Sequence, residues 1–247
     1  MDALGGSGRT ALVRLVLPIA AFSAALAFAA WGEAQPEARP APVATQAAPA
    51  PHPRPRPHGR VAPRRRPEPP IVWHRSRAVG LPWDGRLVGG VRLPREGAHF
   101  FTWDPVLHRA PDRPWRRWGT ARLVRTVLAV IDAYAAAHPH APRVGVGDLS
   151  RPHGSDFGPQ FGGIGHVSHQ NGLDADVYYP RLDRRERAPG TVAQIDRRLA
   201  QDLVDRFVRA GAQVIFVGPS TGLRGPAGVV EALVHHDDHM HVRLPPA

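Results

Sequence analysis

Apolar residues recur at helical spacing in two segments of the chain. The first helix is predicted to begin after Thr120, a candidate N-cap, and to run to about His138, where Pro139 ends it. Its apolar face comprises Val124, Val127, Leu128, Ile131 and Tyr134. The second is predicted over roughly residues 192–210 and ends at Gly211. Its apolar face comprises Ile195, Leu199, Leu203 and Phe207.

Shorter segments of the chain are apolar or alternating, as strands are. We expect strands or extended segments over residues 87–94, 100–103, 143–149, 173–178, 213–217 and 240–244. The strands and the two helices occur in mixed order, without the regular alternation that builds a parallel sheet. This order predicts an α+β fold with a small antiparallel sheet.

The N-terminal third of the chain does not have the pattern of a folded domain. Arg9 and Arg14 precede an apolar run over residues 15–30, which predicts that residues 1–34 are a secretory signal peptide or an uncleaved membrane anchor. Residues 35–70 are rich in Pro, Ala and Arg and contain few large apolar side chains, so we expect a disordered linker. The folded domain is predicted to span residues 71–247.

Composition narrows the classes of function. The formal net charge of +11 is carried by arginine, since the chain has no lysine. No nucleic-acid-binding module accompanies this charge and the predicted export signal opposes one, so we expect no nucleic-acid partner. Cysteine is absent, which excludes disulfides, thiolate metal sites and cysteine nucleophiles. Any metal site must therefore use histidine and carboxylate ligands.

Two short stretches combine histidine and aspartate in a way that predicts a metal site. If residues 173–178 form a strand, Asp174 and Asp176 share one face, because side chains alternate along a strand. By the same rule His239 and His241 point one way, while Met240 points toward the core. Two such strands side by side would present His169, Asp176 and His241 to one ion. Two or three imidazoles with a carboxylate are typical ligands of catalytic zinc.

The same residues resemble a known family. The segment 165–176, with His166, His169 and Asp176, and the segment 239–243, with His239 and His241, are similar to the motifs of the penicillin-insensitive murein endopeptidases. More broadly, they resemble the lysostaphin, D-Ala-D-Ala and hedgehog group of zinc metallopeptidases. The resemblance covers roughly residues 87–244. It implies a sheet of about four antiparallel core strands with flanking helices.

The resemblance also implies roles for individual residues. His169, Asp176 and His241 match the zinc ligands, and His166 matches a further histidine that can bind metal. His239 and His236 match histidines implicated in catalysis. Asp238 stands where the D-Ala-D-Ala branch has a glutamate, three residues before the last ligand, and is an alternative general base.

The activity implied is zinc-dependent cleavage of D-alanyl to meso-diaminopimelyl cross-links in peptidoglycan, in the periplasm. Two alternatives use the same site. One is a D,D-carboxypeptidase or dipeptidase, which frees D-Ala without opening cross-links. The other is a non-catalytic, zinc-stabilised module that binds the cell wall. Retained candidates for proton transfer (His236, Asp238 and His239) argue against the second alternative.

Overall fold

The computed structural model describes residues 68–157 and 166–246 of the chain. The predicted signal peptide or anchor, and all of the predicted linker except its last three residues, lie outside the described residues. Within the described ranges, no helix has the length and apolar character needed to cross a membrane.

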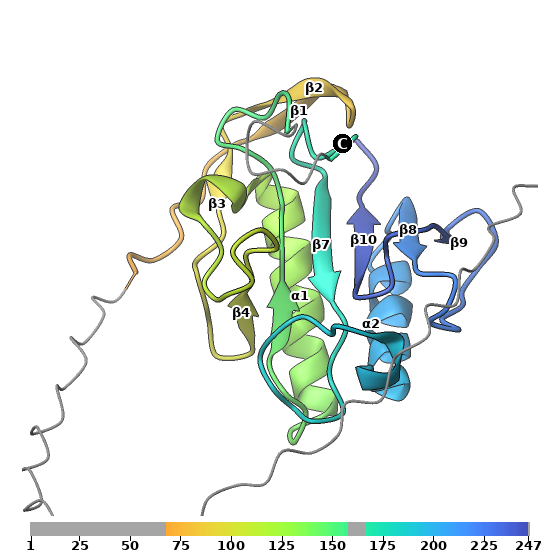
Figure 1. Ribbon diagram of the computed structural model, residues 1–247. Coiled ribbons are helices and arrows are strands. Elements are labelled where there is room, and N and C mark those ends of the chain that lie inside the picture. Colours follow the sequence, from red (N-terminus) through yellow and green to blue (C-terminus); the bar gives the residue numbers. More distant parts are fainter. Residues whose placement is uncertain (1–67, 158–165, 247) are drawn as a thin grey trace, which may run out of the picture. The chain divides into compact units, whose positions relative to one another are not determined.

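A sheet of six strands forms the centre of the domain, with the order β4-β6-β7-β10-β8-β9 (Figure 1). The strands in this order are Phe100–Thr102, Val144–Val146, Asp174–Tyr178, His239–Arg243, Val214–Val217 and Val230–Ala232. The four central strands pair antiparallel, whereas β4 pairs parallel to β6 and β9 parallel to β8. The expected α+β class is confirmed, but the expectation of about four antiparallel strands is wrong for the whole sheet. The edge strand β4 falls within the extended segment predicted over residues 100–103, whereas the three-residue edge strand β9 was not predicted.

Both main helices cover one face of this sheet (Figure 1). Helix α1 spans Ala121–Ala137, and the Thr120 side chain caps it by accepting from the Leu123 N–H at 3.1 Å. Helix α2 spans Arg197–Arg209, and Gly211 follows it with a φ of 82°. Their apolar faces join the inner face of the sheet in one core. The opposite face of the sheet is thereby left for polar residues.

Helix α2 begins later than predicted. Val192–Gln194 forms a 3-10 turn, η3, and Ile195 then adopts extended backbone with its side chain buried. Asp196 is the N-cap of α2, since its carboxylate accepts from the Leu199 N–H at 3.1 Å. The helix start was predicted too early because Ile195 keeps the apolar spacing of the helix although its own backbone is extended.

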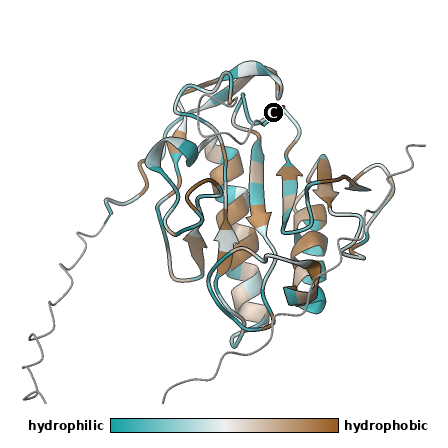
Figure 2. Cartoon of the chain, viewed as in Figure 1, coloured by the Kyte–Doolittle hydropathy of each residue, from teal (hydrophilic) through white to brown (hydrophobic). Residues whose placement is uncertain are grey.

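Smaller elements surround one end of the sheet. Strands β1 (Arg77–Leu81) and β2 (Asp84–Val88) form a hairpin, and β3 (Val91–Arg92) pairs with β5 (Trp118–Gly119) after the 3-10 turn η1 (Pro114–Arg116). In the central sheet, β4 and β8 are mainly hydrophobic, whereas β7 and β10 carry hydrophilic positions (Figure 2). The polar positions of β7 and β10 are those of the predicted metal site.

Candidate metal centre

The candidate site is built on the pairing of β7 with β10. The two strands are antiparallel, with His241 opposite Asp176 and Arg243 opposite Asp174. The intervening residues Ala175, Val177, Met240 and Val242 belong to the core. The predicted alternation is therefore confirmed: both motifs face away from the helices.

Three ligand-type atoms from the two motifs converge on one point. His169 Nε2 lies 3.2 Å from His241 Nδ1, and Asp176 Oδ1 lies 3.3 Å from the first and 3.2 Å from the second. Zinc bonds to nitrogen and oxygen are about 2.0–2.2 Å long, so two ligand atoms on a zinc tetrahedron stand about 3.3–3.5 Å apart. The three side chains are buried. Their spacing fits a small tetrahedral cation.

Hydrogen bonds fix which ring nitrogen each histidine presents. His169 Nδ1 lies 2.5 Å from the Leu149 carbonyl oxygen and must donate its proton there. His241 Nε2 lies 3.2 Å from Asp174 Oδ1, which likewise takes a donated proton. The inward nitrogens, His169 Nε2 and His241 Nδ1, are then the ones placed to bind a metal ion beside the Asp176 carboxylate. Partners of this kind commonly orient metal-binding histidines.

The electrostatics of the cluster favour a positive charge at its centre. In the metal-free chain, burial opposes ionisation of His241, but Asp174 and Asp176 outweigh it and raise its pKa to about 9. Burial also opposes ionisation of Asp176, yet His169 and His239 bring its pKa well below the usual value. The pKa of His169 is lowered, chiefly by burial. A proton on His241 thus occupies the position that a cation would take.

A tight turn between the motif residues aims His169 at the site. His169 has a φ of 70°, uncommon for a residue with a side chain, and its N–H donates to Asp174 Oδ2 at 2.8 Å. Gly172 has a φ of 75°, and a Cβ there would stand 2.8 Å from Leu87 Cδ1 and 3.1 Å from the Thr120 nitrogen. Glycine is therefore required where the turn passes beneath the hairpin and the start of α1.

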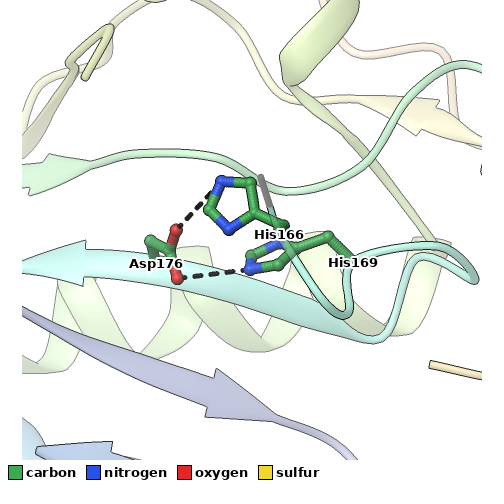
Figure 3. A group of neighbouring side chains, drawn as sticks. All are labelled: His166, His169 and Asp176. Carbon is green, nitrogen blue, oxygen red and sulfur yellow. Dashed lines mark ion pairs between the residues drawn. The ribbon is translucent and has the colours of Figure 1, made fainter. Parts of the chain in front are cut away.

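His166 gives a second, overlapping set with His169 and Asp176, whose ligand-type atoms all lie within 4.8 Å of one another (Figure 3). Its Nε2 is 4.0 Å from Asp176 Oδ2 but only 2.6 Å from Asp148 Oδ2. Asp148 is fully buried and also pairs with Arg116, so its carboxylate holds the His166 ring at the edge of the site.

The other predicted site residues lie around β10. His239 Nδ1 donates to Asp238 Oδ1 at 2.7 Å, and its Nε2 is 3.7 Å from Asp176 Oδ1. Burial lowers the pKa of His239, but Asp176 and then Asp238 outweigh it, so the net shift is upward. His236 donates from Nδ1 to the Val234 carbonyl at 2.9 Å and its ring is 5.0 Å from that of His239. Burial and the neighbouring His239 lower the pKa of His236.

A cleft of about 520 Å³ opens beside these residues. Its lining includes His166, Asp176 and His239, together with Trp103, Tyr178 and the residues 188–191. Tyr178 follows Asp176 by two residues on the predicted strand, but nothing in the sequence indicated that Trp103 or residues 188–191 would meet the motifs, because they come from separate segments. The cleft has room for a peptide at the face of the sheet that carries the histidines.

A sequence profile of the penicillin-insensitive murein endopeptidases matches residues 78–215, more than half of the chain. The chain belongs to this family. A comparison with curated proteins found no match. The predicted family resemblance is thereby confirmed, and the fold and cleft are those of a member of a peptidase family.

The match includes His166, His169 and Asp176 but stops before β10. His239 and His241 are therefore connected to the family segment by the geometry of the sheet, which pairs β10 with β7. The roles of individual residues in metal binding and catalysis stay predictions.

Proposed function

We propose that this chain is a zinc-dependent peptidoglycan hydrolase, an endopeptidase that cleaves D-alanyl to meso-diaminopimelyl cross-links in murein. The observation that carries the proposal is the triangle of His169 Nε2, Asp176 Oδ1 and His241 Nδ1, with sides of 3.2–3.3 Å, of which Asp176 also lines the cleft. These three residues are the proposed zinc ligands. His166, held by Asp148, is a further metal-binding candidate at the edge.

Zinc held by these three residues would supply Lewis-acid chemistry, which would polarise a scissile carbonyl and lower the pKa of water to about 7. Asp174 and the Leu149 carbonyl keep the two ligand imidazoles in the tautomers that bind metal. Fixed tautomers matter because a protonated nitrogen has no lone pair to offer.

Proton transfer is assigned to the pair of His239 and Asp238. The Asp238 carboxylate accepts from His239 Nδ1, which leaves Nε2 directed at the cluster, 3.7 Å from Asp176 Oδ1. In the metal-free chain Asp176 and then Asp238 raise the pKa of His239, and the Asp238 hydrogen bond does not involve a proposed zinc ligand, so it favours a His239 that can give a proton to the leaving amine. Neutral His236, beside it, is the second candidate for proton transfer or for stabilising the oxyanion.

Murein as substrate places the site of action in the periplasm or cell wall. This location agrees with the signal peptide or membrane anchor predicted for residues 1–34.

The test uses the full chain, purified with zinc and incubated with cross-linked muropeptide dimers, with and without a chelator. Products are identified by liquid chromatography and mass spectrometry. Chelator-sensitive conversion of dimers to monomers without free D-Ala is the expected result. Free D-Ala released from stem peptides that are not cross-linked would indicate a D,D-carboxypeptidase in place of an endopeptidase. One bound zinc per chain without turnover would instead indicate a non-catalytic module that binds the bacterial cell wall.

A further inference from the structure

One side of the cleft is formed by four consecutive loop residues, Ala188, Pro189, Gly190 and Thr191, which we call the wall. The wall belongs to the loop that follows β7 and leads into η3 and α2. Trp103 and Pro105, from the segment after β4, also line the cleft. A peptide lying in the cleft would therefore meet the wall as well as the histidine motifs.

The wall has no charged or large side chain. It can contact a peptide only through its shape and its main-chain groups, together with one hydroxyl. The strength of such contacts depends on where the backbone lies, because hydrogen bonds weaken steeply outside a narrow range of distance and angle. Whatever holds the wall in place consequently decides how well it binds.

Two side chains hold the wall from behind. Arg181 is 4% exposed, and its guanidinium donates to both oxygens of Asp183, at 2.7 and 2.6 Å. It also donates to the Ala188 carbonyl at 3.4 Å and to Gln194 Oε1. The same Gln194 oxygen accepts from the Gly190 N–H at 2.8 Å. One amide oxygen thus joins the buried arginine to the middle of the wall.

Neither Arg181 nor Gln194 lines the cleft. An ion pair also holds the same loop: Arg143 donates to both carboxylate oxygens of Glu186 at 2.7 and 2.6 Å. Glu186 lies in the loop but outside the wall, and this pair is exposed. The loop is therefore held by two arginine interactions, and only the one through Arg181 and Gln194 contacts the wall.

We infer that Arg181 and Gln194 are positioning residues that fix the wall against the peptide substrate and thereby determine KM. This inference rests on the proposed peptidase function and adds a determinant of substrate binding to it. Residues that hold a binding surface without touching the substrate change substrate affinity more than the chemical step, provided that the reacting groups stay in place. The ligand triangle, on β7, β10 and the turn before β7, does not depend on this tie.

The decisive variant is Gln194→Ala, compared with Gln194→Glu and with the control Glu186→Gln. Gln194→Ala removes the shared acceptor, so KM for cross-linked muropeptide dimers should rise about tenfold while kcat stays within about twofold. Gln194→Glu keeps an acceptor for Arg181 and Gly190 and should restore a KM close to that of the unaltered chain. Glu186→Gln should leave KM unchanged. Zinc content should be equal in all four proteins.

Binding of the same dimers to zinc-loaded proteins that also carry His239→Ala, which is expected to slow cleavage, gives by calorimetry a readout that does not require turnover. Gln194→Ala should weaken Kd by the same factor. An unchanged KM and Kd in Gln194→Ala would overturn the inference while leaving the peptidase intact. Equal effects of Gln194→Ala and Glu186→Gln would also overturn it, since they would show only general loosening of the loop. An unaltered chain that neither binds nor cleaves the dimers would refute the proposed function, and the inference with it.

Discussion

At the scale of single residues, the candidate site depends on which nitrogen each imidazole presents. His169 presents Nε2 because Nδ1 is bound to the Leu149 carbonyl, and His241 presents Nδ1 because Nε2 is bound to Asp174. With Asp176 Oδ1 they bring electron pairs from three directions into a buried space. Such an arrangement is stable only with a proton or a cation at its centre.

Removing His241 tests the proposed ligand set. His241→Ala leaves two ligands, so the chain should lose stoichiometric zinc binding and its peptidase activity should fall on the order of 10³-fold or more. Zinc content is measured by atomic emission and activity on muropeptide dimers. His140→Ala, between α1 and β6 and not among the residues that line the cleft, is the control and should behave like the unaltered chain. Full zinc content and activity in His241→Ala would rule out the assignment.

Zinc affinity should depend on pH in a direction set by His241. Its pKa of about 9 in the metal-free chain, against an ordinary value of 6.5, means that the folded chain holds a proton there at neutral pH. Zinc must displace that proton, so the apparent affinity should rise about tenfold per pH unit toward pH 9.

The same shift has a consequence for stability. In the metal-free chain the proton on His241 stabilises the fold fully below pH 6.5, and this contribution is lost as pH rises through about 9.

Competition with a chromophoric chelator between pH 6.5 and 8.5 measures the zinc affinity. An affinity independent of pH in this range would contradict the proposed exchange of proton for zinc.

At the scale of elements, alternation in β7 and β10 was enough to predict which side chains share a face, because each strand is flanked by apolar residues that must enter the core. The N-cap at Thr120 was predictable for a similarly local reason. The sequence did not reveal the parallel pairing of β4 with β6, the three-residue edge strand β9, the late start of α2 or the link from Asp148 to His166. These features depend on contacts between segments far apart in the chain, and such contacts do not change the spacing of apolar residues in either segment.

The two faces of β10 are expected to have different roles, because one packs in the core and the other carries candidate site residues. Met240 is fully buried in the core, so Met240→Ala should lower the free energy of unfolding by about 2–5 kcal/mol. Zinc binding by the folded fraction should persist. His239→Ala, on the other face, should lower kcat by about 10²–10⁴-fold with little change in unfolding. Chemical denaturation and steady-state kinetics on both variants check this contrast, and similar losses of stability in the two would refute it.

At the scale of the whole domain, placing both helices on one face of the sheet leaves the other face open for the site. The motifs can then be buried in part by loops rather than by the core, so polar groups gather without disrupting apolar packing. The proposed ligand residues come from β7, β10 and one turn, whereas the cleft is completed by the segment after β4 and by the wall. Asp176, His239 and His241 therefore stand on strands of the sheet, whereas much of the cleft lining comes from loops.

The start of the domain gives the last prediction. Glu68 lies within the range predicted as linker, yet its carboxylate pairs with Arg117, which is 2% exposed, and with Arg92. Glu68→Ala would leave the buried guanidinium of Arg117 with the Leu93 carbonyl but without its carboxylate. We expect this to cost about 1–3 kcal/mol of unfolding free energy. Glu96→Ala, which removes an exposed carboxylate, should cost no more than about 1 kcal/mol. Thermal denaturation of both variants in the full chain decides the point: a melting temperature of Glu68→Ala no lower than that of Glu96→Ala would mean that the folded unit does not depend on residue 68.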